Sequence, residues 1–262
     1  MIPNPDTLDA GEPLGLATPG DVLSGDLAAW KARCAQILAE RGKHLQAVGE
    51  DFVPDRAEVP QMLAEHRRQI SAEIWRRELE RWPHGDYQHA DVRNLLPGQR
   101  ADAVRAWVAD EGARFLLLTG AVGRGKTHLS FALGNYYAAL GWRCRAWSEK
   151  RYLDALRPSS DPEYPDWQVR KYAQGADFLI LDDLGAENTP GEPLSEFVRR
   201  EMHDLLSARL KGSRRTVIST NLSPRQLAGM YGPRIVSRIH QQATSITITG
   251  EDLRVAALPD HW

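Results

Sequence analysis

The stretch "TGAVGRGKTHLS", residues 119–130, decides the fold class of this 262-residue chain. Its Gly120, Gly125, Lys126 and Thr127 match the pattern G-x-x-x-x-G-K-[ST] in full. The glycines let the backbone wrap closely, so that successive N–H groups and the N-terminus of the following helix face phosphate groups. The pattern therefore predicts a phosphate-binding loop for a nucleoside triphosphate.

The roles of single residues follow from this loop. Lys126 is expected to reach the β- and γ-phosphate oxygens, and the Thr127 hydroxyl to bind Mg²⁺. Arg124 and His128 are weaker candidates, because each also fits a solvated loop or helix position. The residues expected to surround the nucleotide are Gly120, Ala121, Val122, Gly123, Arg124, Gly125, Lys126, Thr127 and His128.

Apolar runs on both sides of the loop predict the rest of the fold. "ADFLILDD" (176–183) is uninterrupted, as expected for a strand buried on both faces of a parallel sheet. Strands that alternate with helices favour a parallel, three-layer α/β domain of the P-loop NTPase type. The other strand candidates are "ARFLLLTG" (113–120), "WRCRAW" (142–147), "RTVISTN" (215–221) and "TSITIT" (244–249), and the helix candidates are 126–140 and 194–211.

Polar residues follow two of these predicted strands. Asp182 ends an apolar strand, where its carboxylate can hold the water shell of Mg²⁺. Asp183 stands where an acid could polarise the attacking water, although two adjacent acids also fit a solvated turn. Asn221 brings an amide to the carboxyl edge of the sheet, where ligands gather in such folds. No N-K-x-D stretch for guanine is present, so ATP is the expected nucleotide.

The first third of the chain differs from the rest in composition and hydrophobic pattern. Residues 1–24 are rich in Pro, Gly, Asp and Thr and are expected to form a flexible tail. Residues 25–85 predict two amphipathic helices, the second of which ends at Pro83. These helices could pack on the main domain or offer an apolar stripe to a partner. The expected division is therefore a tail, a helical partner-binding region (25–85) and an ATPase domain (86–262).

Composition limits the classes of protein that remain. The net charge is −2, so no bulk basicity indicates nucleic acid binding. Cys34 and Cys144 form no CxxC pair, which argues against a cysteine-type zinc site or a disulfide framework. No signal peptide and no run near the ~18 apolar residues of a membrane helix is evident. A cytoplasmic protein without a membrane partner is expected.

Two groups of basic residues each permit both a structural and a functional interpretation. Arg234 and Arg238 lie four apart on one predicted helical face, which fits either a solvated helix or an arginine presented to the phosphate of a neighbouring subunit. The second group precedes the fourth strand. It fits a solvated loop better than a DNA contact and consists of Arg209, Lys211, Arg214 and Arg215.

Residues 87–254 resemble the DnaC/DnaI-type helicase loaders, a branch of the AAA+ ATPases that also contains IstB-type transposition helpers. The matching pieces are "LLLTGAVGRGKTHLSFALGN", "LILDDLGAE", "SEFVRREMHDLLSARL", "STNLSPRQLAGMYGPRIVSRI" and "TGEDLR". The resemblance implies that Asn221 is the sensor-1 residue, Arg238 an arginine finger acting in trans, and Arg254 the sensor-2 arginine. It also implies an AAA+ core without a full helical lid, since only eight residues follow Arg254.

The resemblance implies a function as well. A bacterial or phage loader would use Mg²⁺-dependent ATP hydrolysis to place a hexameric replicative helicase on single-stranded DNA. Residues 25–85 would bind the helicase, and the subunits would associate through Arg238. The alternatives are an ATPase helper of a DNA transposase and a nucleotide-dependent adaptor with incidental hydrolysis. Some members carry a glutamate where this chain has Asp183, so slow hydrolysis is expected.

Overall fold

The structure is a computed structural model that describes residues 59–82, 87–95, 98, 100–157, 166–186, 194–212 and 214–252. The expected tail, the first expected helix and Arg254 lie outside these residues. The chain divides into two compact units, Met1–Leu63 and Ala64–Trp262, of which the second contains all five strands of the sheet. In the described part, no helix combines the length and apolarity needed to cross a membrane.

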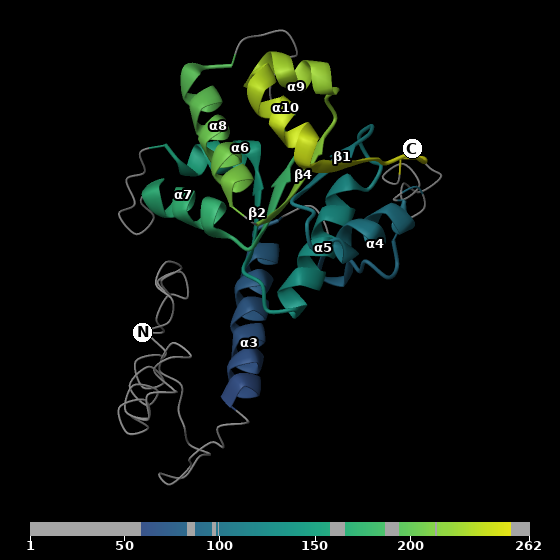
Figure 1. Cartoon of the computed structure of the whole chain (residues 1–262), viewed down its shortest axis with the longest axis vertical. Helices are drawn as coiled ribbons and strands as arrows, with labels where there is room; N and C mark the ends of the chain where they lie inside the picture. The colour runs from purple at the N-terminus through teal and green to yellow at the C-terminus, as the bar shows by residue number, and fades with distance from the viewer. Residues whose placement is uncertain are drawn as a thin grey trace, which may run out of the picture. The chain divides into compact units, whose positions relative to one another are not determined.

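The described strands form one parallel sheet in the order β2-β3-β4-β1-β5. Parallel neighbours require crossover connections, and helical segments separate the strands along the chain. All five strand predictions are confirmed (Figure 1). The strands are β1 (Phe115–Thr119), β2 (Cys144–Ser148), β3 (Phe178–Asp182), β4 (Arg215–Thr220) and β5 (Ala243–Thr247).

Helices cover both faces of this sheet, which confirms the three-layer α/β prediction. Helices α3, α4 and α5 contribute to the core on one face, and α6 to α10 to the core on the other (Figure 1). The bounds are α3 Val59–Glu80, η2 Tyr87–His89, α4 Ala101–Ala109, α5 Lys126–Ala139, α6 Glu149–Ala155, α7 Asp166–Gly175, α8 Glu196–Lys211, α9 Pro224–Tyr231 and α10 Pro233–Gln242.

The central strands are apolar because they supply both cores. In β1, Phe115 and Leu117 pack into one core, whereas Leu116 and Leu118 pack into the other. Successive side chains of a strand point to opposite faces, so a strand covered on both sides has no exposed position to give to polar residues. The uninterrupted apolar runs of the sequence have this origin.

From Ala64 onward, α3 belongs to the second compact unit. The Trp75 indole donates a hydrogen bond to Oδ1 of Asn135 (2.7 Å), and a carboxylate oxygen of Glu78 accepts the backbone N–H of Ala146 on the edge strand β2 (3.2 Å). The boundary expected between residues 85 and 86 therefore differs from that of the compact unit, which begins at Ala64. The sequence permits this helix either to pack on the main domain or to offer an apolar stripe to a partner. Its described part packs on the main domain.

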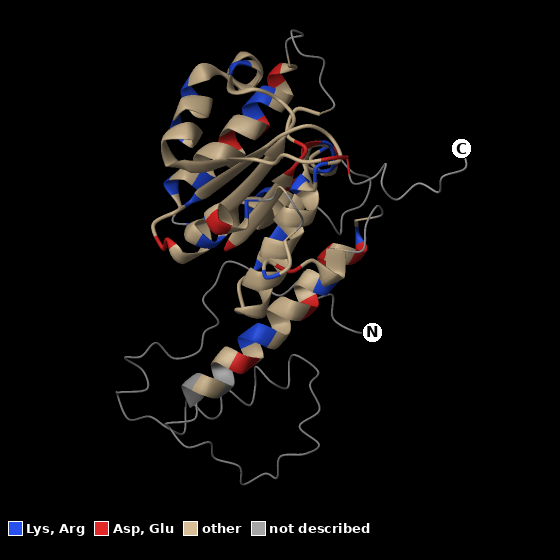
Figure 2. Cartoon of the chain, turned by 90° about the vertical axis from the view of Figure 1, so that its right-hand side faces the viewer, with Lys and Arg blue, Asp and Glu red and all other residues tan. Residues whose placement is uncertain are grey.

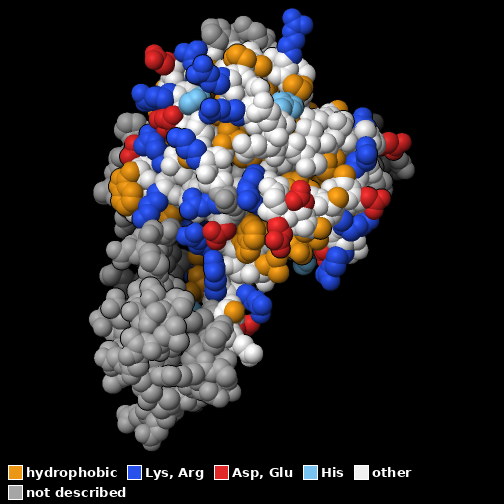
Figure 3. Space-filling view, in the orientation of Figure 1, with side chains coloured by type: hydrophobic (Ala, Val, Ile, Leu, Met, Phe, Trp, Pro, Cys, Tyr) orange, Lys and Arg blue, Asp and Glu red, His pale blue; other side chains and the backbone are white. Residues whose placement is uncertain are grey.

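Charged side chains occupy the outside of both helical layers. The exposed side of α3 carries both signs (Figure 2), with ion pairs such as Arg76–Glu73 and Arg77–Glu73, each 2.9 Å. Exposed pairs of this kind contribute at most about 1 kcal/mol each. Lys and Arg side chains gather over the face formed by α7 and α8 (Figure 3).

Two members of the basic group before β4 are buried, so the expectation of a solvated loop is wrong for them. Arg209 is fully buried and donates hydrogen bonds to the Thr216 hydroxyl (2.9 Å) and to the carbonyl of Arg215 (2.6 Å). Arg215 is buried over the ring of Trp107 and donates to the Tyr137 hydroxyl (2.6 Å). Lys211 and Arg214 are exposed, as expected.

Candidate nucleotide-binding site

The phosphate-binding loop lies between β1 and α5, as the sequence predicts. Gly120 adopts φ 139°, and a Cβ atom there would lie 2.4 Å from the carbonyl oxygen of Ile248. Gly125 adopts φ 85° and is the N-cap residue of α5. Since only glycine tolerates these positions, the loop can curl over the N-terminus of α5, whose N–H groups point toward a bound anion.

Lys126 lies inside this loop. The side chain is 5% exposed, and its ammonium donates hydrogen bonds to the carbonyls of Gly120 (2.9 Å) and Ala121 (2.8 Å). These bonds hold the positive charge at the beginning of the loop. The motif thus places its cation where phosphate oxygens would meet the loop backbone.

Asp182 joins the loop helix to the central strands. One oxygen of its carboxylate accepts a hydrogen bond from the Thr127 hydroxyl (2.9 Å), and the other accepts one from the Ser219 hydroxyl (2.5 Å). The hydroxyl oxygen of Ser219 in turn accepts the backbone N–H of Asp183 (2.9 Å). Residues from α5, β3 and β4 therefore meet at one edge of the sheet.

The charge state of Asp182 is perturbed. Burial raises the pKa of its carboxyl, and the neighbouring Asp183 raises it further, to about 6. Hydrogen bonds from Ser219 and Thr127 and the charge of Lys126 oppose this rise. Perturbed acids gather at functional sites, because burial there serves a later ligand rather than the stability of the free protein.

The two remaining polar residues at this edge are exposed. Asp183 adopts φ 52° in the turn after β3. Asn221 directly follows β4, and the strand order puts β4 between β3 and β1. The end of β4 therefore lies between Asp182 and the phosphate-binding loop. The structure thus brings Lys126, Thr127 and Asp182 together and places Asn221 at the same edge.

A family model decides what kind of site this is. The model described as IstB-like ATP binding protein matches residues 74–257. The chain belongs to this family. It is a DnaC/IstB-type AAA+ ATPase, as the motifs indicate, and ATP is the nucleotide that its site binds.

Solved structures and curated proteins agree with the IstB-like assignment. The DnaC helicase loader is 25% identical, with a TM-score of 0.52, over 62% of this chain and 98% of that chain. DnaI has the same fold, with 24% identity and a TM-score of 0.54 over 66% of this chain and 95% of that chain. The chromosomal replication initiator protein DnaA of Gluconobacter oxydans is 28% identical over 185 residues, which are 63% of this chain and 36% of that protein. The chain thus spans about a third of the length of this curated relative.

Two arginines of the IstB-like chain lie away from the core on α10. This helix buries Ile235, Val236 and Ile239 and leaves Arg234 and Arg238 exposed. An exposed arginine can reach a neighbouring molecule, so the geometry permits the trans role that the resemblance implies for Arg238. That role stays a prediction, and Arg254 lies outside the described residues.

The weaker candidates in the loop have distinct environments. Arg124 and His128 are half-buried, and their Nε and Nδ1 atoms are buried and find no hydrogen-bond partner among the described residues. Burial lowers the pKa of His128, which favours the neutral ring at pH 7. Val122 is 53% exposed. Contacts of these three side chains with the nucleotide remain predictions.

The segment after β5 lies against the phosphate-binding loop. The backbone N–H of Ile248 donates to the carbonyl of Thr119 (2.7 Å). A Cβ atom on Gly123 would lie 1.8 Å from a carboxylate oxygen of Asp252, so that carboxylate already occupies the space beside the loop. The sequence analysis missed this contact, which only the three-dimensional fold reveals.

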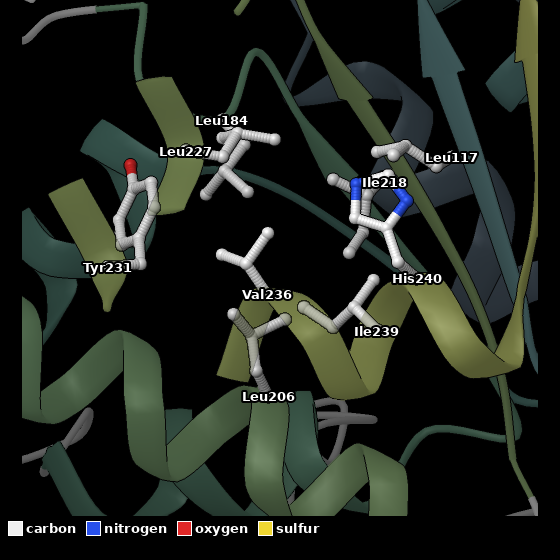
Figure 4. Close-up of a pocket in the computed structure, with 9 residues that line it drawn as sticks. All are labelled: Leu117, Leu184, Leu206, Ile218, Leu227, Tyr231, Val236, Ile239 and His240. Carbon is white, nitrogen blue, oxygen red and sulfur yellow. The ribbon is translucent and has the colours of Figure 1, made fainter. Parts of the chain in front are cut away.

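The structure also contains a small pocket with a mostly apolar lining (Figure 4). Helices α8, α9 and α10 and strands β1 and β4 supply most of its lining. None of the expected site residues lines it. The lining residues are Leu117, Leu184, Leu206, Ile218, Leu227, Tyr231, Val236, Ile239 and His240.

Proposed function

We propose that this protein hydrolyses ATP with Mg²⁺ and uses the cycle to load a hexameric replicative helicase onto single-stranded DNA. The observation that carries the proposal is the contact between the Thr127 hydroxyl and the Asp182 carboxylate beside the phosphate-binding loop. The similarity to the DnaC helicase loader, at 25% identity over nearly all of that chain, supports the choice of task.

The donor set fits a magnesium ion. Thr127 and Asp182 offer a hydroxyl and a carboxylate oxygen 2.9 Å apart, and Mg²⁺ takes oxygen ligands, with few from the protein when phosphates supply others. Bound there, Mg²⁺ would neutralise charge on the β- and γ-phosphates. Lys126 would bind the same phosphates, and Ser219 would keep the Asp182 carboxylate oriented.

Asp183 and Asn221 would act on the water that attacks the γ-phosphate. Asp183 would accept a hydrogen bond from this water, and its backbone is fixed by Ser219. Asn221 would orient the water or the γ-phosphate from the end of β4. Since aspartate is one methylene shorter than glutamate, we propose that its water is held less closely and that hydrolysis is slow.

Arg238 would complete the site of a neighbouring subunit. A positive charge beside the transferring phosphoryl group is worth 10³–10⁵ in rate in nucleotide hydrolases that use such an arginine. We propose that the subunits associate through this exposed side of α10 and that Arg254 faces the nucleotide of its own subunit. Hydrolysis would then depend on assembly.

The partner is the finer part of the proposal. Residues 25–85 would bind the helicase, and the protein would work in the cytoplasm. The family description, IstB-like ATP binding protein, favours a second candidate, an ATPase helper of a DNA transposase. Capture experiments with the full chain and ATP, using a replicative helicase and a transposase from the same genome, separate the two. Binding to the transposase alone would overturn the loader.

Mixing two inactive variants tests the ATPase cycle. Lys126→Ala lacks a working pocket but keeps the arginine, whereas Arg238→Ala lacks the arginine but keeps the pocket. A 1:1 mixture should regain ATPase activity, because about one head-to-tail interface in four then joins a good pocket to a good arginine.

The matched control is Arg225→Ala, which removes an exposed arginine from the neighbouring helix α9 and should keep full activity. No activity at any mixing ratio would contradict a finger acting in trans.

A further inference from the structure

Glu149 is a buried carboxylate to which neither the motifs nor the proposed mechanism gives a role. It is the first residue of α6, directly after β2, and is 2% exposed. One of its oxygens accepts the backbone N–H of Gly185 (2.8 Å), and both oxygens lie 2.8 Å from the Tyr231 hydroxyl, which donates to them. A buried carboxylate is costly without such donors, so these bonds help to keep it in place.

The first donor belongs to the turn that carries Asp183. Gly185 follows Asp183 by two residues and adopts φ 80°. The turn is also fixed to β4, because Leu184 donates its N–H to the carbonyl of Ser219 (2.9 Å) and accepts the Thr220 hydroxyl (2.7 Å). Asp183 and the Gly185 N–H therefore belong to one short turn, whose middle residue Leu184 is bonded to β4.

The second donor belongs to the corner from which α10 begins. Tyr231 is the last residue of α9, and Gly232 is at once the C-cap of α9 and the N-cap of α10. Tyr231 lies 82 residues from Glu149 in sequence, so only the fold joins them. Its hydroxyl bonds this corner to the same carboxylate that accepts the N–H of Gly185 from the turn after β3. Arg234 and Arg238 follow within the next two turns of helix.

We propose that Glu149 is a positioning residue that couples a subunit's own nucleotide site to the arginine it presents to its neighbour. The coupling rests on the proposed function, that is, on hydrolysis completed by Arg238 in trans. One carboxylate holds both the turn with Asp183 and the corner before α10, so the two cannot move independently. The state of one site thereby sets the readiness of the next subunit's site.

Three variants separate the two halves of this link. Glu149→Ala removes both bonds. Glu149→Gln keeps an oxygen for the Gly185 N–H, and its amide can donate to the Tyr231 oxygen, so it should retain most of the activity. Tyr231→Phe removes only the bond to the corner. The matched controls are Tyr152→Phe, a buried tyrosine whose hydroxyl bonds to nothing in the described part of the chain, and Glu201→Gln, a buried glutamate paired with Arg170.

Nucleotide affinity and turnover give the first readout. Glu149→Ala should bind ATP within about twofold of wild type, because Lys126 and Thr127 are untouched, while kcat falls about tenfold to a hundredfold, as misplacement of catalytic groups by about 1 Å produces. The two control variants should keep wild-type kcat. A loss of melting temperature with unchanged kcat would show a purely structural role and overturn the proposal.

Mixing gives the decisive readout. Mixed with Lys126→Ala, the Glu149→Ala subunit supplies the pocket, and mixed with Arg238→Ala, it supplies the arginine. Neither mixture should regain ATPase activity. Tyr231→Phe should rescue Lys126→Ala but fail with Arg238→Ala, whereas Tyr152→Phe should rescue both. If Tyr231→Phe rescues Arg238→Ala as well as Tyr152→Phe does, the link to α10 is refuted, and this test holds even where Glu149→Ala does not fold.

The mixture of Lys126→Ala with Arg238→Ala is the reference. Its failure to regain activity would overturn the trans arginine and the coupling with it. Its success together with full rescue of both partners by Glu149→Ala would overturn the coupling alone. The two failures are thus distinguishable in one set of assays.

Discussion

The two ends of the sheet are both rich in polar residues, yet they differ in how those residues are satisfied. At the carboxyl ends of the strands, Asp183 and Asn221 are exposed and Asp182 is buried with a raised pKa. At the amino ends, Arg209 and Arg215 are buried and bonded to backbone carbonyls. Because ligands of open α/β sheets bind at the carboxyl end, we propose that the first set serves a ligand, whereas the second holds the fold.

Asp177 illustrates the amino end further. Burial alone would raise the pKa of its carboxyl, but hydrogen bonds from the guanidinium and the backbone N–H of Arg143 outweigh burial and lower it. Asp182 shows the opposite outcome, since burial outweighs its hydrogen bonds. The half-buried acid at the amino end is therefore stabilised in its charged form within the protein, and the buried acid at the carboxyl end is not.

The largest effect is expected at the carboxyl end from Lys126→Ala. The variant should lose measurable ATP affinity, because the ammonium inside the loop supplies charge to the phosphates, while its melting temperature stays near that of wild type, since the lysine lies outside both cores. Binding of a fluorescent ATP analogue and thermal unfolding check this. Lys211→Ala makes the same chemical change at an exposed position after β3 and before β4 and should keep affinity. If folded Lys126→Ala bound ATP as tightly as wild type does, the contrast drawn between the two ends of the sheet would be wrong.

The second effect belongs to the amino end. Arg209→Ala should lower the free energy of unfolding by about 3–5 kcal/mol, because it leaves the carbonyls of Ala176 and Arg215 buried without their donor. Burial lowers the pKa of Arg209 to about 9, so the side chain still carries its charge at pH 7. Urea denaturation measures the loss, with the exposed Arg199→Ala on the same helix as control. ATP affinity of the folded fraction should be unchanged, and a stable variant that cannot bind ATP would reverse the assignment of the two ends.

Sequence reasoning recovered the strands and the loop because their signals are local. An apolar run such as 176–183 and a glycine-rich motif depend on few neighbours in the chain. The burial of Arg209 was missed, because in sequence it resembles the exposed Lys211 two positions later. Ser219 was missed too, although a hydroxyl near the end of an otherwise apolar strand could have indicated a partner for Asp182.

Helix α3 shows the same limit. His66, Ile70 and Ile74 recur at helical spacing, as an apolar face would, yet they are only half-buried. The buried positions are instead Trp75 together with two polar residues, Ser71 and Glu78. Their burial depends on backbone groups of other segments that accept or donate their hydrogen bonds. Hydrophobic periodicity cannot reveal such partners, because they lie about 70 residues away.

A third, smaller effect is the pH dependence of stability that follows from the raised pKa of Asp182. With a folded pKa of about 6 against an ordinary aspartate pKa of 3.8, Asp182 binds more protons in the folded than in the unfolded state between these pH values. The stability of the nucleotide-free protein should therefore fall as pH rises through this window, by up to about 3 kcal/mol. In EDTA, Asp182→Asn should gain stability relative to wild type between pH 4.5 and 7.5, while the exposed Asp183→Asn should not. If the stability of wild type and of Asp182→Asn depended on pH in the same way, the buried carboxylate of Asp182 would not destabilise the nucleotide-free protein.

The smallest effect is expected from the exposed members of the basic group, Lys211 and Arg214. Arg214 donates to the carbonyl of Gln174 at the surface (2.9 Å), so Lys211→Ala and Arg214→Ala should each change stability by less than about 0.5 kcal/mol. If the amino end serves only the fold, neither change should alter the salt dependence of single-stranded DNA binding.

Measuring DNA affinity over a range of salt concentrations decides this point, because each lost phosphate contact lowers the slope of log K against log salt by about 0.7 for a single strand. An unchanged slope in the double variant, with wild-type affinity, leaves the amino end without a ligand. A slope reduced by about 0.7 per residue would show that the amino end also binds phosphates, as the sequence alone left open. The contrast between the two ends would then hold for the buried Arg209 and Arg215 but not for their exposed neighbours.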